Sequence, residues 1–440
     1  MLVGKELQVL AESRSLWLMF VVSSVLVGHA FLDALQFYAE ASGSGGGPAA
    51  LSQSLSPLDG LVVPVFGAFD LMATLVFPFV VIRLFAVERE TGELALSLQQ
   101  PVPFWLLVAA KAVALSLAWM AALIPAGVAL AIWKAHGAHL HEAETMVVVG
   151  GYLLRGALTI GIGAAACSIT GSASSAAIIA LTITLGTWML DYIAAAKGGV
   201  VAVLSTYTPD AALRSFERGE LRLSAVLVLG MLVVAGLTLW GSSAQTGRSR
   251  RWRLRAAAGT LALAMVLCAG VAVWKQSWDV SEDRRNSFSS ADERVLTRIR
   301  EPLTVTVHLA AEDPRLTDLE HGVLFKLRRT VHQLHVEYAA KSRSGLFESS
   351  GSSYGEIWLD AAGRRVVTRS VAEPVVLDAV YEVLHIVPPA AESNAYPGYP
   401  AHVESAIAPW LFFALIPLGI VLLWWRVHVR QVDFPTALTS

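Results

Sequence analysis

Apolar residues are concentrated in long runs along this chain, and polar residues gather in the segments between them. The hydrocarbon core of a bilayer is about 30 Å thick, so a helix needs roughly 20 mostly apolar residues to cross it. Eight runs approach or exceed that length and predict transmembrane helices. They are Leu16–Gln36, Leu61–Phe85, Phe104–Trp133, Met146–Ile169, Ser172–Ile193, Leu223–Trp240, Ala256–Trp274 and Ala406–Trp425.

Residues 1–15, which precede the first run, mix apolar and polar types. Their apolar members fall near helical spacing, and they are Leu2, Val3, Leu7, Leu10 and Ala11. Such a short amphipathic segment predicts a helix that lies in the membrane interface instead of crossing it. No cleavable signal peptide is expected, because the first run is long enough to span and no small-residue cleavage site follows it.

The chain changes character between the seventh and eighth runs, over residues 275–405. Strand-like alternation and helix-like spacing occur there together, which predicts an α/β domain. With about 130 residues, the segment is long enough to bury a core of its own. The expected elements are a strand within 303–312, a helix over Leu319–Ala340, a Gly/Ser loop at 341–355, two strands within 356–371 around a turn at 360–363, a helix over 373–387 and a proline-rich connection at 388–402.

The distribution of lysine and arginine predicts the orientation of the spans, since basic residues favour the cytoplasmic side. The strongest signal is a cluster of arginines between the sixth and seventh runs, at Arg248, Arg250, Arg251, Arg253 and Arg255. This arrangement predicts cytoplasmic N- and C-termini. The domain at 275–405 is then extracytoplasmic.

Composition supports the membrane interpretation. Of 440 residues, 55% are hydrophobic and 15% are charged, whereas about a quarter of a soluble domain is charged. The net charge of −2 gives no general attraction to nucleic acid, so no nucleic-acid partner is expected. Cys167 and Cys268 both lie in apolar runs and are interpreted as small packing residues.

The loop after the second run carries the candidate functional motif. Glu88, Arg89 and Glu90 are followed by Thr91 and Gly92, and the loop ends at the sequence Pro-Val-Pro. A short amphipathic helix with exposed charges, stopped by proline, would account for this composition. It would present a rigid element to a partner protein. The alternative interpretation is a solvated connector.

The stretch from Ala86 to Lys111 resembles the coupling segment of the ABC type-2 permease family. The matching residues are Glu88, Arg89, Glu90, Gly92, Leu94, Leu96, Pro101, Val102 and Lys111. An interfacial first helix, six spans and an outer segment before the sixth span, containing Pro209 and Phe216–Gly219, are also similar to that family. The resemblance covers about residues 1–245 and implies that Glu88–Gly92 couples the chain to an ATPase.

The segment after the seventh run resembles the extracytoplasmic domain of the gliding-motility auxiliary ABC transporter protein family. The matching residues are Asp279, Ser281, Ser287, Ser289, Leu296, Pro302, Val305 and Val307. Residues 354–370 and 396–400 are similar to segments near the end of such domains. The domain here is shorter than is usual in that family. The implied architecture is a permease fused to an auxiliary domain.

The chain contains no G-x-x-x-x-G-K-[ST] motif, so it encodes no phosphate cradle of that type. We therefore expect a non-catalytic subunit with no directly bound cofactor. The resemblance implies two nucleotide-binding subunits that carry ATP and Mg and dock under Glu88–Gly92. It also implies a homodimer, or a heterodimer with a related permease, surrounded by lipid. A periplasmic protein partner is a further possibility.

Asp70 and Arg155 are ionisable residues deep within two apolar runs. Each lies nine positions into its run, about 14 Å from the outer edge at 1.5 Å per residue. Equal depth and opposite charge predict an intramembrane polar pair, because an isolated charge at that depth is costly. Three interpretations are open: a gate in a transport path, an ion pair that fixes helix packing, or two residues that do not touch.

An outer loop at 136–144 contains His136, His139 and His141 together with two glutamates. Closely spaced imidazoles can bind a divalent metal. The favoured interpretation is nevertheless an ordinary polar loop, because its spacing is irregular, so no metal site is expected. The metal site on these three histidines is the alternative.

These observations divide the chain into five parts: an interfacial helix at 1–15, a six-helix permease at 16–245, a basic linker with the seventh helix at 246–274, the α/β domain at 275–405, and the eighth helix with a cytoplasmic tail at 406–440. The favoured hypothesis, which rests on the resemblance, is an ABC permease subunit of a bacterial inner membrane, with an unidentified cargo. The alternative is a mechanotransmitting subunit or anchor, which passes ATPase-driven motion to a periplasmic partner and transports no solute.

Overall fold

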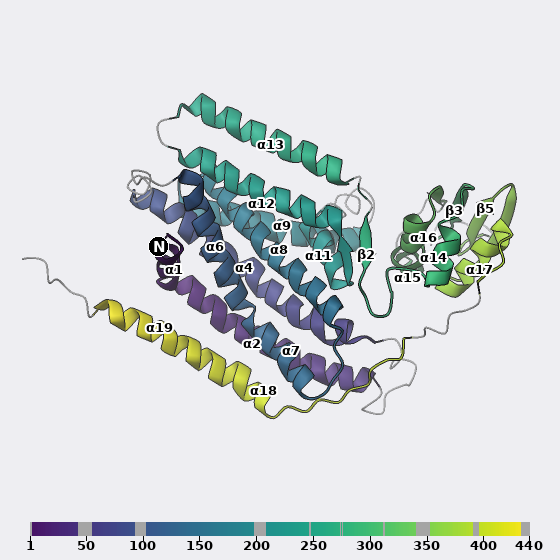
Figure 1. Cartoon of the computed structure of the whole chain (residues 1–440), viewed down its shortest axis with the longest axis horizontal. Helices are drawn as coiled ribbons and strands as arrows, with labels where there is room; N and C mark the ends of the chain where they lie inside the picture. Colours follow the sequence, from purple (N-terminus) through teal and green to yellow (C-terminus); the bar gives the residue numbers. More distant parts are fainter. Residues whose placement is uncertain are drawn as a thin grey trace, which may run out of the picture.

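The computed structural model describes residues 2–42, 55–92, 103–197, 208–245, 248–272, 274, 276–310, 313–339, 353–389 and 396–432. Within these residues, eight helices are long and apolar enough to cross a membrane. The long helices lie side by side in a bundle, and a small α/β domain extends beyond one end (Figure 1). We call that end of the bundle the domain end. The opposite end, where Arg250 begins a helix, is called the basic end.

Each predicted apolar run coincides with a long helix, although the helix ends differ by several residues. The bounds are α2 (Arg14–Ala41), η1 (Leu58–Val62) with α4 (Val63–Thr91), α6 (Phe104–Ala122) with α7 (Ile124–Ala135), α8 (Glu142–Ile169), α9 (Ala173–Lys197), α12 (Leu223–Ala244), α13 (Arg250–Ala272), and α18 (Ile407–Trp410) with η3 (Leu411–Leu415) and α19 (Ile416–Val432). Leu123 separates α6 from α7, because Pro125 has no N–H with which to continue the backbone ladder.

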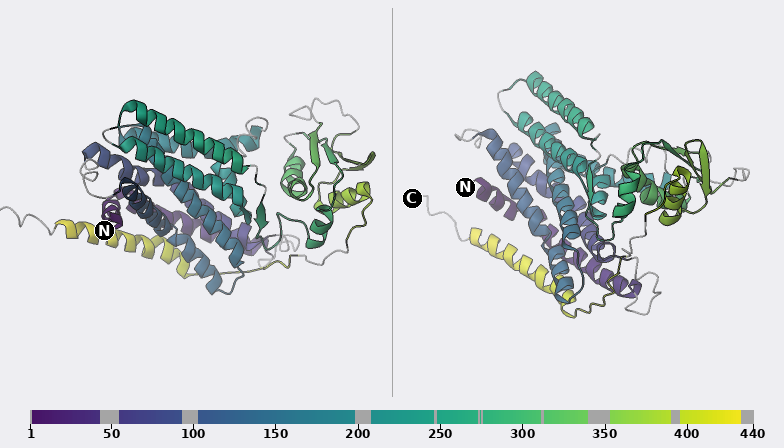
Figure 2. Two further views of the ribbon diagram at one scale, coloured as in Figure 1. Left: turned by 45° about the horizontal axis from the view of Figure 1, so that its top comes forward. Right: turned by 45° about the vertical axis from the view of Figure 1, so that its right-hand side comes forward.

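The centre of the bundle is occupied by α4, which packs against α2, α8 and α9. Two of its aromatic side chains are fully buried: the rings of Phe69 and Phe77 lie 5.0 and 4.7 Å from that of Trp119 on α6. The outermost helices, α13 and α19, pack on α12 and α2 at opposite sides of the bundle (Figure 2). The segment that forms the domain therefore leaves the bundle on one side and returns on the other.

The domain contains a four-stranded sheet in the order β4-β3-β5-β6, with β3 parallel to β4 and the other pairs antiparallel. Its elements are β3 (Leu303–Val307), β4 (Leu334–Tyr338), β5 (Ile357–Ala361), β6 (Arg364–Thr368), α14 (Ser290–Leu296), α15 (Pro314–Leu319), η2 (Glu320–Leu324), α16 (Phe325–Thr330) and α17 (Glu373–Leu384). Alternate residues of β3 are buried, and they pack with the helices in a separate core. The predicted α/β character of this segment is confirmed.

The helix predicted over Leu319–Ala340 is wrong in its second half. Helical structure ends at Thr330, and Leu334–Tyr338 forms β4. The open edge of β3 supplies backbone partners in parallel register, which outweighs the local helical spacing. The two strands predicted around residues 360–363 are confirmed, and both turn residues, Ala362 and Gly363, have positive φ. The predicted loop at 341–355 and the connection at 388–402 fall partly outside the described residues.

A second, two-stranded sheet connects the domain to the bundle. The short helix α11 (Pro209–Glu217) leads into β1 (Glu220–Arg222), which pairs antiparallel with β2 (Ser277–Asp279). The turn between α11 and β1 requires Gly219, whose φ is +72°. At the other end of the bundle, the predicted interfacial helix is α1 (Leu2–Ala11), which packs against α6.

Helices α8 and α12 approach so closely that a side chain would not fit between them. A Cβ atom added to Gly236 would lie 2.1 Å from the carbonyl oxygen of Gly161. Small residues allow this kind of backbone approach between helices in an apolar environment. The position of α12, and of the β1 strand that precedes it, therefore depends on two glycines.

Replacing Gly236 by valine should force α8 and α12 apart. Overpacking typically costs about 1–3 kcal/mol, and a clash with backbone cannot be relieved by a rotamer change. We expect a clearly lower Tm for Gly236→Val in detergent. The matched control is Gly230→Val on the same helix, where nothing lies within 4 Å of an added Cβ. Equal Tm values for the two variants would contradict the close approach.

Candidate functional site

A single continuous helix, η1 followed by α4, connects the two ends of the bundle. It runs from Leu58 to Thr91 and has 34 residues, which corresponds to about 50 Å at 1.5 Å per residue. Three polar networks contact it, one at the basic end, one within the bundle and one at the domain end. The candidate functional site is this helix together with its three networks.

The basic-end network consists of Lys5, Glu6, Glu88 and Lys111. The Lys111 ammonium lies 2.9 Å from Glu6 Oε2 and 2.8 Å from Glu88 Oε2, and it donates to the Leu84 carbonyl at 3.1 Å. Lys5 lies 3.4 Å from the other oxygen of Glu88. The network ties α1 to α4 and α6.

The charges of this network balance, since two lysines meet two glutamates. The Lys111 side chain is only 2% exposed, whereas that of Lys5 is 49% exposed. Burial raises the pKa of Glu6, and the nearby Lys111 opposes that rise. A buried ammonium is tolerated only when carboxylates neutralise it, so the position of α1 is coupled to Glu88 on α4.

The residues predicted to couple the chain to an ATPase do not form a separate short helix with exposed charges. The α4 helix continues through them and ends only at Gly92, where φ is +81°. Glu88 lies on the inward face and is 3% exposed. Glu90, Thr91 and Gly92 are exposed at the basic end. Pro101 and Val102, with the rest of 93–102, lie outside the described residues.

Two of these residues also join neighbouring helix ends to α4. Arg89 donates to the carbonyl oxygen of Cys167, near the end of α8, at 3.2 Å. Glu90 Oε1 accepts from the backbone N–H of Ala173 at 2.6 Å, at the N-terminus of α9. A carboxylate at that position satisfies an unpaired amide and complements the helix dipole. A displacement of the α4 end would thus be shared by α1, α6, α8 and α9.

The Arg155 cluster lies within the bundle. Arg155 Nε is 3.4 Å from Asp70 Oδ1, so the structure brings together the two residues expected to pair. A second carboxylate, Asp210 from α11, lies closer, at 2.9 Å from the other end of the guanidinium. The hydroxyl of Tyr152 donates to Glu217 at 2.7 Å. The Arg155 cluster comprises Asp70, Thr74, Tyr152, Arg155, Asp210 and Glu217.

Sequence reasoning missed Asp210 and Glu217. Both lie in a short segment between apolar runs, where acidic residues are usually solvated. One signal was available: Asp210 follows Pro209 at the start of α11, where Thr208 accepts from the N–H of Ala211 as an N-cap. An amphipathic helix at that place can fold back on the bundle and carry its acids inward.

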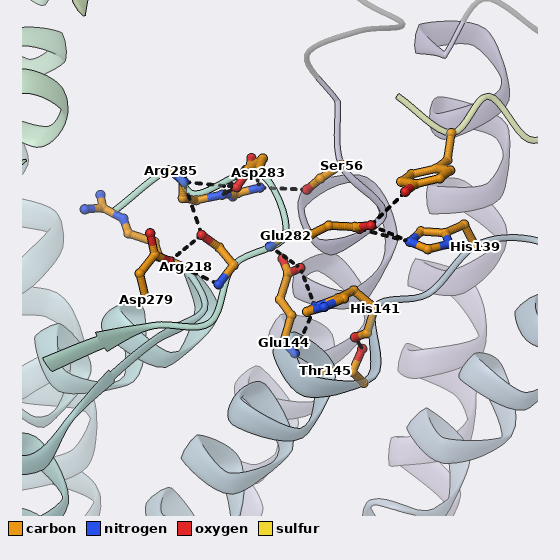
Figure 3. A network of polar contacts seen from close by, with 12 residues as sticks. Ser56, His139, His141, Glu144, Thr145, Arg218, Asp279, Glu282, Asp283 and Arg285 are labelled. Carbon is orange, nitrogen blue, oxygen red and sulfur yellow. Dashed lines mark hydrogen bonds and ion pairs between the residues drawn. The ribbon is translucent and has the colours of Figure 1, made fainter. Parts of the chain in front are cut away.

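The domain clasp is the third network, and it joins the domain to the bundle (Figure 3). Its members are Ser56, Asp59, His139, Glu144, Glu282, Arg285 and Tyr399. The carboxylate of Glu282 contacts His139 Nε2 at 2.9 Å and accepts from the Tyr399 hydroxyl at 2.8 Å. Its backbone N–H donates to Glu144 at 3.3 Å. The clasp thus joins the α7–α8 connection and the segment before α18 to the root of the domain.

Arg285 connects the clasp directly to the long helix. Its guanidinium lies 2.6 Å from Asp59 on η1 and donates to Ser56 at 2.7 Å. It also pairs with Asp283 at 2.9 Å. These hydrogen bonds to carboxylates raise the pKa of Arg285 further above its usual range, against the effect of burial. The start of η1–α4 is thereby fixed to the chain segment that leads into the domain.

The three histidines weighed as metal ligands have separate partners. His136 contacts the carbonyl of Ile132 at 2.8 Å, and His141 accepts from the N–H of Glu144 as the N-cap of α8. The ring of His139 stacks on that of Tyr399 with centroids 3.6 Å apart. Over the described part of the chain, no group of three or more His, Cys, Asp or Glu residues could hold a metal ion.

Comparisons of the chain with protein-family models, with curated proteins and with solved structures found no match. The geometry of the site is therefore the only guide to its function.

Replacing Lys111 by methionine should leave two buried carboxylates without their shared cation. Removing one partner of a buried ion pair costs about 3–5 kcal/mol, so we expect a large loss of thermal stability and release of α1. Hydrogen exchange of residues 2–11 is the local measurement. The control is Lys134→Met, which breaks the exposed pair with Glu142 and should have no measurable effect. Unchanged exchange in Lys111→Met would contradict the proposed role of this lysine.

Replacing Arg285 by methionine should loosen the root of the domain without unfolding the domain core, because Arg285 is not part of that core. We expect several-fold faster proteolysis between residues 276 and 289, and faster hydrogen exchange there. Arg284→Met is the matched control, since Arg284 is exposed and its side chain contacts the nearby Ser290. If both variants are cleaved at the wild-type rate, Arg285 does not hold the clasp.

Proposed function

We propose that this chain is the membrane-spanning subunit of an ABC-type machine whose ATPase is a separate nucleotide-binding protein. The observation that carries the proposal is the continuous helix from Leu58 to Thr91. One end presents exposed residues at the basic end, and the other end is fixed through Asp59 to the root of the domain. Such a helix can carry a displacement from one side of a membrane to the other.

In this proposal the ATPase docks at the basic end, on Glu90, Thr91 and Gly92. These residues are exposed, and they end a helix that does not bend away from the bundle. Two nucleotide-binding subunits, with ATP and Mg, would serve two copies of this chain or this chain and a relative. The basic end would face the cytoplasm of a bacterial cell, as the arginine cluster favours.

Movement at the docking site would reach several helices at once. Glu88, Arg89 and Glu90 join α4 to α1, α6, α8 and α9 through ion pairs and hydrogen bonds. A helix can transmit motion along its axis through its ladder of backbone hydrogen bonds, and in α4 Pro78 removes one bond from that ladder. The domain clasp then receives the motion at Asp59. Transmission of ATPase-driven motion to the domain, and through it to a periplasmic partner, is the mode that this geometry supports best.

Export of a cargo through the bundle is the second candidate mode. It is favoured by the Arg155 cluster, which places charged groups among otherwise apolar helices. Intramembrane ionisable residues commonly mark transport paths. Long apolar faces elsewhere suit an apolar or amphiphilic cargo. Both modes use the same ATPase docking site and differ in what happens at the domain.

Thr91→Arg should abolish ATPase docking while leaving the basic-end network intact, because Thr91 is exposed and Glu88 is buried. The tagged chain is purified from the cells that make it, and the ATPase activity retained with it is measured. We expect activity with wild type and at least tenfold less with Thr91→Arg. Gln8→Arg, exposed on α1, is the control and should retain the activity.

The docking proposal is contradicted if wild type retains no ATPase, or if Thr91→Arg retains as much as wild type. Hydrogen exchange of the same purified complex distinguishes transmission from export. In transmission, ATP changes hydrogen exchange in residues 276–310, and Arg285→Met loses that change while hydrolysis continues. If exchange in this region is insensitive to ATP although hydrolysis proceeds, export is favoured.

A further inference from the structure

The Arg155 cluster contains more buried carboxyl groups than its one buried cation can neutralise. Asp70 comes from α4, and Asp210 and Glu217 come from α11. Among the side chains that the structure describes, Arg155, which is 4% exposed, is the buried cation that contacts them. The guanidinium contacts Asp210 at 2.9 Å and Asp70 at 3.4 Å. One unit of positive charge therefore meets two carboxyls directly, and the third carboxyl, Glu217, lies near enough to interact with both of them.

Asp210 provides an independent indication that a ligand is missing from this balance. Its side chain is 9% exposed, and its Oδ1 atom pairs with Arg155. Its second oxygen, Oδ2, is buried and has no hydrogen-bond partner. An ionised carboxylate oxygen in that state is strongly unfavourable, because it has lost water and gained no donor. The Oδ2 atom therefore marks a position at which the cluster lacks a donor.

Among the described side chains, the other groups that face the cluster do not restore neutrality. Thr74 on α4 and Tyr152 on α8 are uncharged, and each interacts with a charged member through its hydroxyl. Arg214 on α11 is exposed and acts on Glu217 from the solvent side. Arg218 is half-buried after the end of α11, and burial together with Arg214 and Arg222 lowers its pKa. Neither arginine forms an ion pair with Asp210 among the described contacts.

We propose that the Arg155 cluster is a proton-binding site, in which Asp70, Asp210 and Glu217 together hold at least one proton at neutral pH. The proton belongs to the group as a whole, since strongly interacting carboxyls titrate together. Burial raises the pKa of Glu217, and the negative charges of Asp70 and Asp210 raise it further. Tyr152 and Arg214 act in the opposite direction.

The site lies where a change in protonation can move the domain. α11 carries Asp210 and Glu217 and leads directly into β1, which pairs with β2 at the root of the domain. Loss of the proton adds negative charge between α11 and α4 and favours their separation. Because the pKa of Glu217 is raised in the folded protein, its protonated form stabilises, at low pH, the arrangement in which α11 lies against the bundle. That stabilisation is lost as the pH rises through the raised pKa.

The proposal does not depend on the proposed ATPase coupling, and it can be tested on the full-length protein alone in lipid nanodiscs. Infrared spectroscopy distinguishes a protonated carboxyl from a carboxylate, and exchange into D2O identifies the carboxylic-acid band. At pH 7 exposed carboxyls are ionised, so a residual acid band reports buried groups. We expect such a band in wild type, declining as the pH is raised above the ordinary carboxyl range.

The double variant Asp210→Asn/Glu217→Gln leaves Asp70 and Arg155 as a neutral pair, so it should lose the part of the band that the cluster contributes. Asp360→Asn is the control, because Asp360 pairs with Arg365 on the surface of the domain, far from the cluster, and this variant should leave the band unchanged. If the double variant fails to fold, the single variant Glu217→Gln, which keeps both contacts of Arg155, is measured in its place. It should show a smaller band than wild type.

Two results would overturn the proposal. The first is an acid band of wild-type size in both cluster variants, which would assign the protonated carboxyls elsewhere in the protein. The second is conversion of the cluster band to carboxylate when sodium chloride is added at constant pH, with potassium or choline chloride having no effect. That result would identify a sodium site in place of a proton site.

Discussion

Charges buried inside an apolar helix bundle must be neutralised by neighbours, because neither lipid nor packed side chains can solvate them. This constraint decides which helices meet. Lys111 holds Glu6 and Glu88 and thereby brings α1 and α4 to α6. Arg155 holds Asp70 and Asp210, and so brings α4 and α11 to α8. The long central helix α4 takes part in both networks.

The same constraint explains why the domain is joined firmly to the bundle. Arg285 pairs with Asp59 at the start of the long helix, and Glu282 is shared between His139 and Tyr399. Each contact brings together residues far apart in the chain. The domain end of α4 and the root of the domain therefore form one polar unit. A displacement of either part must break ion pairs or move the other part with it.

Several features of the site follow from local pattern alone. Asp70 and Arg155 could be recognised because each interrupts an apolar run, where an ionisable residue needs a partner. Glu88–Gly92 could be recognised from a mixed-charge segment at the end of a run. The burial of Glu88 could not, since helical α4 continues past the apolar run and turns that residue toward Lys111. Asp210 and Glu217 carried no comparable signal, because only the folding back of α11 removes them from water.

By itself, the sequence determined the eight long apolar helices and the α/β segment between the last two, because length, hydropathy and alternation are local properties. Tertiary structure decided the rest. It made Leu334–Tyr338 a strand, because the edge of β3 offered backbone partners. It placed Asp70 and Asp210 against Arg155 and connected Asp59 to Arg285, because pairing of distant charges depends on how the helices pack and not on their spacing in the chain.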